Sequence, residues 1–428
     1  MHARWVPAHT RGSFTLIPWS LSGMTDGDDA VVVELPAAHL KAPIVLVETQ
    51  QQWQAARDDL STGEGPLAVD AERASGFRYS QRAYLVQLYR RGSANYLVDP
   101  IAVSDLSDLT REFAHLEWII HAAHQDLPCL REVGVNPARL FDTELVGRLV
   151  GLERVGLQGA VEDLMGLALA KEHSAADWST RPLPAPWLTY AALDVELLPD
   201  LRDILHGLLE EKDLEAIAQE EFVAALEAPA PTPREQPWRR LSGLHQVKGG
   251  RSLAIAKALW EARDSYASEI DRAPGRLVPD RSLVAAVLAN PSSQRELASL
   301  KAFHGRASRS ELPRWWAAIE AGRTAEDLPS ARVASDGPPP PRIWADKNPV
   351  AAKRLVAARK GIEALSEETG IPGENLLTPD HLRRVCWEPP ATLTEAALAE
   401  HLGELGARSW QRTLMVPLLL EAFVSEPQ

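Results

Sequence analysis

Pro66-Leu67-Ala68-Val69-Asp70-Ala71-Glu72 is an apolar run that ends in two carboxylates one residue apart. The run predicts a buried β-strand, and the two-residue period of a strand places Asp70 and Glu72 on one face. Two like charges this close repel unless a cation lies between them, and a divalent cation with hard oxygen ligands suits that position. Because a solvated strand end has the same pattern, the rest of the chain must decide between a metal site and an exposed edge.

The composition is that of a soluble globular protein with several domains. A chain of 428 residues, 45% of them apolar, is too long for one hydrophobic core, so about two to four domains are expected. No apolar run approaches the roughly 20 residues that span a bilayer. Cys129 and Cys386 are the only cysteines, which excludes a disulfide framework and a cysteine-based zinc site and favours a reducing cytoplasm.

The charge is unevenly distributed. A net charge of -14 argues against a nucleic-acid partner, because such binding depends on Lys and Arg at the phosphates. The acidic excess lies in Lys41–Glu221, with 16 basic and 30 acidic residues, whereas the chain after residue 221 holds 27 basic and 25 acidic residues. Arg234–Asp264 and Arg342–Lys360 are locally basic and are candidate surfaces for phosphates.

Two Pro-rich stretches divide the chain, and both predict semi-rigid linkers. The segment before the first stretch mixes strand and helix patterns, whereas the two segments after it are helical throughout. Met24 is an alternative start for the chain. The expected order is a disordered leader over 1–40, an α/β domain over 41–227, a linker over 228–233, a helical domain over 234–330, a linker over 331–341 and a second, loosely repeated helical domain over 342–428.

Within the α/β domain, short β-rich runs alternate with helical patterns. The helical pattern prevails after the last of these runs, as far as Glu227. Strands are predicted at Ile44–Val47, Pro66–Glu72, Tyr84–Tyr89, Asn95–Val98 and Trp118–His121, and helices at Gln51–Leu60 and Leu106–His115.

Two further carboxylates lie at positions that suit a shared site. Asp126 follows the strand Trp118–His121, where the chain passes into a helix. Helix capping is its alternative explanation, since Asp is favoured near helix N-termini. Tyr190 and Asp194 are four residues apart, which puts both on one helix face one turn apart, although such pairs are also common on surfaces.

Together, Asp70, Glu72, Asp126 and Asp194 can meet at two Mg²⁺ ions about 4 Å apart, the arrangement used for phosphodiester hydrolysis. One ion would generate the hydroxide and the other would stabilise the leaving 3′ oxygen. Tyr190 would hold the attacking water, because a phenol with a pKa of about 10 orients water better than it removes a proton.

The sequence around these residues resembles a known family. Asp70-Ala-Glu72, His121-Ala-x-x-x-Asp126-Leu and Tyr190-Ala-Ala-x-Asp194-Val are similar to the three exonuclease motifs of ribonuclease D, a member of the DEDD superfamily of 3′-to-5′ exonucleases. The Tyr-x-x-x-Asp spacing marks the tyrosine subclass. The resemblance covers about residues 44–220 and implies a ribonuclease-H-like sheet with flanking helices. Further matches are Phe141–Glu144, Gly156–Leu157, Val161–Leu164, Lys171 and Asp177–Leu183.

The chain departs from the family just after the first motif. Members often have Thr between the two carboxylates and an aromatic residue after them that seats the substrate 3′ end, where this chain has Ala71 and Arg73. Phe77 or Tyr79 could substitute for that aromatic residue. Gln87 matches a family glutamine and is a candidate RNA contact, with a polar edge-strand residue as the alternative.

Several other side chains near the motifs have alternative roles. Lys171 and Arg181 are candidate phosphate ligands, or they shape the rim of the site. His121 and His124 suggest zinc, but four carboxylates favour Mg²⁺ or Mn²⁺, and His121 is better explained as a structural residue at the strand end.

The first helical domain also has a family resemblance. Trp238–Phe303 is similar to the helicase-and-RNase-D C-terminal (HRDC) domain, a small helical bundle that binds nucleic acid in several families. Lys248, Arg251 and Lys257, on the predicted first basic helix, are the expected phosphate contacts, and a packing module is the alternative. The chain from Arg342 onward resembles a degenerate second copy.

These observations predict a ribonuclease-H-like α/β exonuclease domain followed by two all-α HRDC-like domains. The predicted activity is that of a cytoplasmic, monomeric 3′-to-5′ exoribonuclease with two Mg²⁺ or Mn²⁺ ions. It would release nucleoside 5′-monophosphates from single-stranded 3′ ends of RNA such as tRNA precursors. A DNA-directed exonuclease and a non-catalytic RNA-binding protein are the alternatives, since the motifs do not encode the sugar.

Overall fold

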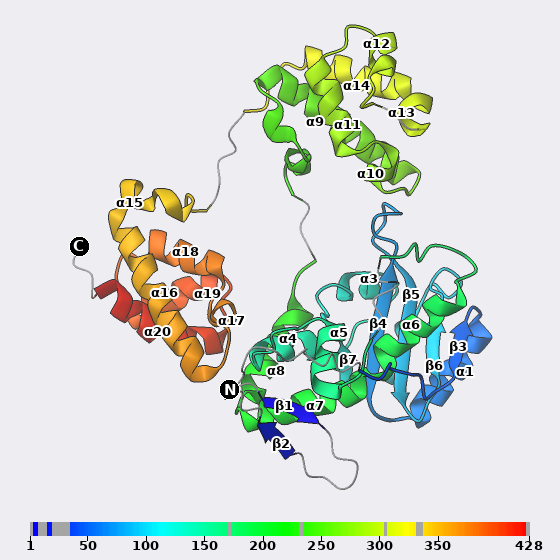
Figure 1. The fold of residues 1–428 in the computed structure, drawn as a ribbon, viewed down its shortest axis with the longest axis vertical. Coiled ribbons are helices and arrows are strands. Elements are labelled where there is room, and N and C mark those ends of the chain that lie inside the picture. Colours follow the sequence, from blue (N-terminus) through cyan, green and yellow to red (C-terminus); the bar gives the residue numbers. More distant parts are fainter. Residues whose placement is uncertain are drawn as a thin grey trace, which may run out of the picture.

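The computed structural model describes residues 3–6, 15–18, 35–169, 173, 175–230, 234–303, 306–330 and 337–424. Figure 1 shows three bodies, which we name by their content. The sheet domain runs from Ile44 to Glu227, the first helical domain from Pro237 to Thr324, and the second helical domain from Pro341 to Val424.

The sheet domain is built on a mixed six-stranded sheet with the order β3-β6-β5-β4-β7-β8. β5 pairs antiparallel with β4 and β6, and the other neighbouring pairs are parallel. The central position of β4 follows from its apolar run, because Leu67, Ala68 and Val69 are fully buried. The strands are β3 (Ile44–Val47), β4 (Glu64–Arg73), β5 (Ala83–Arg91), β6 (Asn95–Val98), β7 (Trp118–Ile120) and β8 (Leu140–Asp142).

Helices cover the sheet and bring distant segments to β4. α6 packs against β4, β5 and β6, and α7 packs against β4 and β7. The helices are α1 (Gln50–Thr62), α2 (Ser107–Glu112), α3 (Leu127–Glu132), α4 (Thr143–Leu149), α5 (Leu157–Ala160), the π-helical turn η1 (Val161–Met165), α6 (Ala185–Glu196), α7 (Leu198–Glu211) and α8 (Glu215–Glu227).

The first helical domain is organised around α9, which packs against α11 and α14. Its core includes the fully buried Trp315 and is separate from that of the sheet domain. The elements are η2 (Pro237–Arg240), η3 (Leu244–Gln246), α9 (Gly250–Glu269), α10 (Pro274–Leu277), α11 (Asp280–Ala289), α12 (Gln294–Ser299), α13 (Arg306–Ser310) and α14 (Leu312–Thr324).

The second helical domain packs α16 against α18 and α20. Its buried side chains, Trp344 and Trp410 among them, form one continuous hydrophobic cluster with the sheet domain. The elements are η4 (Pro341–Ile343), α15 (Trp344–Lys347), α16 (Pro349–Thr369), α17 (Gly373–Leu376), α18 (Pro379–Trp387), α19 (Glu395–Glu404) and α20 (Ser409–Val424).

The predicted fold class is confirmed: an α/β sheet domain precedes two helical domains. The sequence did not predict β8, a strand of three residues at the sheet edge. Within the predicted leader, β1 (Ala3–Val6) and β2 (Thr15–Pro18) form an antiparallel pair that was not expected, and the rest of residues 1–34 lies outside the described part.

The predicted linkers are described only in part, since residues 231–233 and 331–336 lie outside the described ranges. In the part of the chain that the structure describes, no helix has both the length and the apolar character of a membrane span.

Candidate active site

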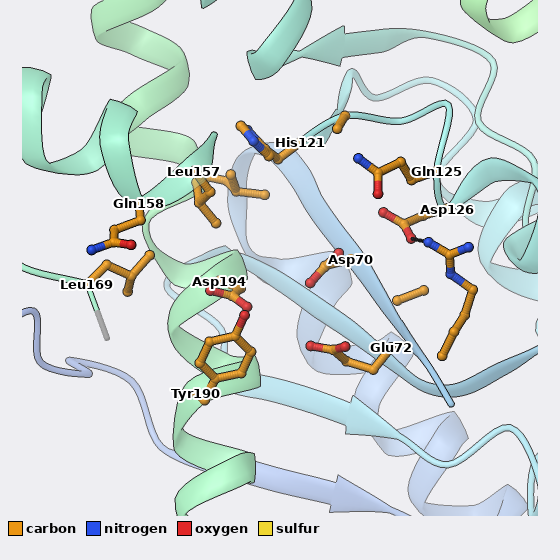
Figure 2. Close-up of a pocket in the computed structure, with 14 residues that line it drawn as sticks. Asp70, Glu72, His121, Gln125, Asp126, Leu157, Gln158, Leu169, Tyr190 and Asp194 are labelled. Carbon is orange, nitrogen blue, oxygen red and sulfur yellow. Dashed lines mark ion pairs between the residues drawn. The ribbon is translucent and has the colours of Figure 1, made fainter. Parts of the chain in front are cut away.

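A cavity of about 340 Å³ opens beside the carboxyl-terminal half of β4. Figure 2 shows side chains from three places in the sequence pointing into it. β4 contributes two carboxylates, the turn after β7 a third, and α6 a fourth together with a phenol. The structure thereby brings Asp70, Glu72, Asp126, Asp194 and Tyr190 to one cavity.

Asp70 and Glu72 reach the cavity through the alternation of β4. Asp70 lies opposite Gln87 of β5 in the antiparallel register, and the Gln87 amide Nε2 donates to Asp70 Oδ2 at 3.4 Å. Gln87 is fully buried, so its amide contacts the Asp70 carboxylate and is not exposed to solvent. Gln87 therefore lies behind Asp70, where it restrains the orientation of that carboxylate.

Asp126 lies at the start of α3, yet it does not act as a helix cap. Its side chain makes no capping hydrogen bond, and its carboxylate lines the cavity instead. The turn that presents it contains Ala122 at φ 56°, a left-handed conformation that L-residues rarely adopt. The turn must therefore be held by contacts from outside.

Asp142 supplies those contacts. Its carboxylate accepts the backbone N–H groups of Ala122 at 3.0 Å and Ala123 at 2.8 Å, and it also caps α4 through the N–H groups of Glu144 and Leu145. Burial raises the pKa of Asp142 to about 6, against the opposing effect of these donors. In the sequence, Asp142 is recognisable only as part of a family match, and its position at the end of the unpredicted β8 explains why its contacts were not predicted.

Asp194 and Tyr190 lie one turn apart on α6, as the spacing predicts. Asp194 is 6% exposed, which excludes the alternative of a surface pair. The Tyr190 hydroxyl donates to the Asp194 carboxylate, and its ring packs against Trp178 with 6.4 Å between centroids. Burial and the nearby carboxylates raise the pKa of Tyr190, so the phenol stays protonated and serves as a hydrogen-bond donor.

The four carboxylates raise one another's proton affinity. Burial is the largest cause of the raised pKa of Asp70, Glu72, Asp126 and Asp194. The charge of Asp70 raises the pKa of the other three further, whereas Arg73 lowers the pKa of Asp70, Glu72 and Asp126. One guanidinium does not balance this cluster, so further positive charge would stabilise it.

The donor set fits divalent cations. Carboxylate oxygens of Asp70, Glu72 and Asp194 lie within 4.8 Å of one another, and Asp126 lines the same cavity with Oδ1 at 3.7 Å from Arg73 Nη2. An all-carboxylate set is the ligand type that Mg²⁺ and Mn²⁺ prefer. These residues could therefore hold hard cations without rearrangement of the fold.

The histidines beside Asp126 do not form a zinc site. His121 Nδ1 lies 2.9 Å from Thr143 Oγ1, and burial lowers the pKa of His121 to about 4. His124 is 67% exposed and lies 4.0 Å from Glu144. Neither belongs to a group of potential metal ligands among the described residues, in agreement with the structural interpretation of His121.

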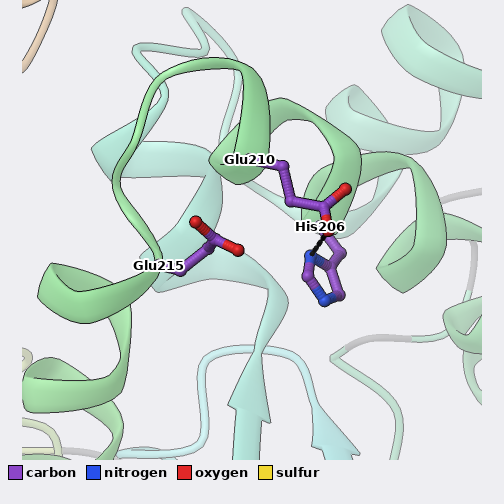
Figure 3. Close-up of side chains that lie close together, drawn as sticks. All are labelled: His206, Glu210 and Glu215. Atoms are coloured by element: carbon purple, nitrogen blue, oxygen red, sulfur yellow. Dashed lines mark ion pairs between the residues drawn. The ribbon is translucent and has the colours of Figure 1, made fainter.

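A second group of potential ligands lies on α7 and α8, away from the cavity (Figure 3). It consists of His206, Glu210 and Glu215, whose ligand atoms also lie within 4.8 Å of one another. Both glutamates are exposed, and His206 pairs with Glu210 one helical turn away at 4.0 Å. Exposed acidic groups of this kind are common without a metal, so the group does not define a site.

The residues predicted to contact nucleic acid are spread more widely. Arg181 donates to Asp99 Oδ2 at 2.6 Å and to the Tyr84 carbonyl at 2.7 Å, so its guanidinium is engaged inside the sheet domain. Lys171 lies outside the described residues. Lys248 precedes α9 and donates to the His245 carbonyl at 2.8 Å.

Two predicted contacts lie on α9 itself. Arg251 donates to the Ala325 carbonyl at 2.5 Å and so caps the carboxyl-terminal end of α14. Lys257 lies 3.7 Å from Glu261 one turn along α9. None of the residues Arg181, Lys248, Arg251 and Lys257 lines the cavity, and their role in RNA binding stays a prediction.

The aromatic residues proposed as substitutes at the substrate 3′ end point elsewhere. The ring of Phe77 lies under the Arg276 guanidinium at 3.7 Å, and the Tyr79 hydroxyl bonds to Asp264 at 3.0 Å. Both partners belong to the first helical domain. Arg73, in contrast, lines the cavity, which the alternation of a strand did not predict.

Comparison with known proteins agrees with this geometry. Three family models match: a 3′-5′ exonuclease over residues 44–210, an HRDC domain over 252–319, and a 3′-to-5′ exonuclease C-terminal domain over 337–423. Ribonuclease D of Acidiphilium cryptum is 32% identical over 349 residues, which covers 76% of this chain and 86% of that relative.

Solved structures extend the match to most of the chain. A crystal structure of a protein from Bifidobacterium adolescentis is 34% identical and covers 90% of this chain and all of its own, with a TM-score of 0.80. Escherichia coli RNase D, described as an exoribonuclease involved in structured RNA processing, is 25% identical over 90% of this chain and all of its own, with a TM-score of 0.63. The sequence resemblance is thereby confirmed, and the chain belongs to the ribonuclease D family of 3′-5′ exoribonucleases.

Proposed function

We propose that this exoribonuclease hydrolyses the terminal phosphodiester with two divalent cations held by Asp70, Glu72, Asp126 and Asp194. The observation that carries the proposal is that four carboxylates line one cavity: two come from β4, one from the turn after β7 and one from α6. Their raised pKa values are the second support, since mutual repulsion and burial leave the cluster short of positive charge. Mg²⁺ or Mn²⁺ matches these ligands.

When bound, the two cations would supply an activated water and stabilise the leaving 3′ oxygen. The residues of the chain set the geometry of that reaction. Asp70, held by Gln87, lies at the centre of the cluster, because its charge acts on the other three carboxylates. Asp142 fixes the turn that carries Asp126.

Tyr190 would orient the attacking water. Its hydroxyl is held at the cavity by Asp194, and its raised pKa keeps the proton on the phenol at neutral pH. Because the single O–H of Tyr190 is donated to Asp194, the phenol oxygen would accept a hydrogen bond from the water and so align it for attack on phosphorus. Because the bond to the 3′ oxygen breaks, each turnover would release a nucleoside 5′-monophosphate.

The substrate class we propose is the single-stranded 3′ end of structured RNA, such as a tRNA precursor, bound by a monomer. The involvement of the similar Escherichia coli RNase D in structured RNA processing supports this class. Lys171, Arg181, Lys248, Arg251 and Lys257 stay candidate RNA contacts, whereas the predicted contact Gln87 is fully buried and bonds to Asp70 instead. The basic excess after residue 221 supports contacts outside the sheet domain.

The first test is hydrolysis of a labelled RNA with a free 3′ hydroxyl in Mg²⁺ or Mn²⁺. We expect stepwise shortening from the 3′ end and nucleoside 5′-monophosphate as product, with none in excess chelator. Asp70→Asn should reduce the rate to background, whereas the control Asp58→Asn, an exposed position on α1, should keep the wild-type rate. Wild-type activity in Asp70→Asn would overturn the proposal, and equal cleavage of a matched DNA would assign the enzyme to DNA as well.

A second test separates the role of Tyr190 from those of the metal ligands. We expect Tyr190→Phe to lower kcat by about 10²-fold, within the range for a lost proton-transfer or water-orienting group. Calorimetric Mn²⁺ binding should stay close to that of the wild type, because no ligand atom is lost. A Tyr190→Phe variant with wild-type kcat would exclude this role.

A further inference from the structure

Arg73, the last residue of β4, lines the cavity beside an irregularity in the sheet. Glu72 pairs with Leu85 and Arg73 with Ala83, so the register of β4 and β5 shifts between them and Tyr84 is left out of the pairing. In a regular strand, Arg73 would point to the face opposite Glu72. Bulges are frequent next to active sites, and here Glu72 and Arg73 line one cavity although they are consecutive residues of β4.

The contacts of Arg73 are few and electrostatic. Its Nη2 lies 3.7 Å from Asp126 Oδ1, a distance that indicates an ion pair without a short hydrogen bond. The Arg73 side chain is 27% exposed and the Asp126 side chain 9%, so the pair sits at the wall of the cavity with the guanidinium nearer to solvent. Among the described residues that line the cavity, Arg73 is the only lysine or arginine.

We propose that Arg73 exchanges partners during the reaction cycle: it is the counter-ion of Asp126 before cations bind, and it binds a phosphate of the RNA 3′ end after they bind. This inference rests on the proposed two-cation function. Two divalent cations carry as much positive charge as the four carboxylates carry negative charge. With the cations bound, Asp126 therefore attracts the Arg73 guanidinium less strongly. A phosphodiester entering the cavity is then the nearest anion.

The chemistry of the side chain supports a phosphate as the second partner. A guanidinium is a planar fork that matches two phosphate oxygens, and it is more weakly hydrated than an ammonium. The long side chain allows movement from Asp126 toward the opening without a change in β4. Phe77 and Tyr79, in the loop that follows β4, contact the first helical domain, whereas Arg73 at the end of β4 lines the cavity.

The first measurement is Mn²⁺ binding to RNA-free protein by titration calorimetry. Arg73→Gln removes the charge that competes with a cation at Asp126, so we expect Mn²⁺ to bind at least about threefold more tightly than in the wild type. Arg73→Lys keeps the charge and should stay within about twofold of the wild type. The control Arg111→Gln, an exposed residue paired with Asp108 on its own helix, should leave Mn²⁺ binding unchanged.

The second measurement is the KM for a 3′-hydroxyl RNA at saturating Mn²⁺. We expect Arg73→Gln to raise KM by about tenfold, the size of one lost charge-assisted hydrogen bond, and Arg73→Lys to recover only part of it. Arg111→Gln should keep the wild-type KM.

Each of the two measurements tests a different part of the proposal. Unchanged Mn²⁺ affinity in Arg73→Gln would disprove the role as counter-ion, and unchanged KM would disprove the phosphate contact. Either result overturns the exchange while the wild type still binds Mn²⁺ and degrades RNA. Failure of the wild type itself to bind Mn²⁺ or to degrade RNA would instead overturn the proposed function.

Discussion

The two helical domains share a run of three helices but attach to the sheet domain in different ways. In each, a long helix, α9 of 20 residues or α16 of 21, is followed by a four-residue helix, α10 or α17, and then by α11 or α18. The loose repeat predicted from the sequence is therefore visible as a repeated order of elements. What differs between the two copies is the surface that each one uses.

The second helical domain shares the hydrophobic core of the sheet domain. Trp410 is 7% exposed, its indole N–H donates to Glu221 at 2.8 Å, and its backbone N–H lies 3.3 Å from Glu220. Asn375 donates to the Arg148 carbonyl at 3.1 Å on the same side. This attachment is apolar and extensive, which is typical of a permanent structural interface.

The first helical domain has a separate core and attaches through a loop. Asp271 accepts the backbone N–H groups of Tyr79 and Ser80 at 3.1 Å and 2.8 Å and the Tyr84 hydroxyl at 3.2 Å. The loop between β4 and β5 directly follows Glu72 and Arg73. The second helical domain therefore contributes stability to the sheet domain, whereas the first is connected to the end of the central strand by polar contacts.

The largest expected effect tests this division with two matched tryptophans. Trp410→Ala and Trp315→Ala each remove a buried indole, at a cost of about 3–5 kcal/mol. We expect Trp410→Ala to lower the calorimetric transition of the sheet domain, because the two share one core. Trp315→Ala should lower a separate transition and leave that of the sheet domain in place. A common shift of all transitions in both variants would show that the three domains unfold as one unit.

A somewhat smaller effect is expected from cations and pH. Burial and mutual charge raise the pKa of Glu72, Asp126 and Asp194, so the metal-free folded protein binds protons that the unfolded chain has released. Stability in chelator should therefore fall as pH rises above about 4, the ordinary carboxyl range, toward the raised pKa values.

Mn²⁺ should reverse that fall, by about 2.7 kcal/mol at a hundredfold excess over its Kd. We expect Mn²⁺ to raise the transition of the sheet domain and second helical domain only, since the carboxylates belong to that core. Calorimetry at pH 5 and pH 8, with and without Mn²⁺, measures both effects. A metal-free protein that becomes more stable between these pH values would contradict the repulsive cluster.

Much of the site could be predicted from the sequence because it depends on local periodicity. The period of two in β4 and the spacing of four on α6 each place a pair of side chains on one face, and the structure has both pairs at the cavity. The family motifs supplied the order along the chain, in which Asp70 and Glu72 come first, Asp126 follows, and Tyr190 and Asp194 come last. These features need only the residues of one strand or one helix.

The features that could not be predicted depend on pairing between segments. Arg73 lines the cavity at the point where the pairing of β4 with β5 passes over Tyr84, and the sequence of β4 alone does not indicate that shift. Asp142 holds the turn before Asp126 from twenty residues away, at the end of a strand too short to show a period. Phe77 was one of two candidates, with Tyr79, for the missing aromatic residue at the substrate 3′ end, but its ring is covered by Arg276 from another domain.

The smallest expected effect concerns the polar attachment of the first helical domain. Asp271→Ala removes the acceptor of the Tyr79 and Ser80 N–H groups, at a cost to the contact of about 1–3 kcal/mol. We expect kcat/KM on a long RNA to fall by about fivefold to tenfold, because the loop after Glu72 loses its anchor. Hydrolysis of a dinucleotide, which reaches only the cavity, should keep its rate.

The control for this prediction is Glu269→Ala, two residues earlier, whose side chain is 62% exposed and pairs with Arg314 at 3.7 Å inside the first helical domain. It removes the same charge and leaves the loop contacts intact, so it should degrade both substrates at the wild-type rate. If Asp271→Ala lowers the rate on the long RNA and on the dinucleotide equally, the loop supports the chemistry itself. The attachments of both helical domains would then contribute to the sheet domain, although one is polar and the other apolar.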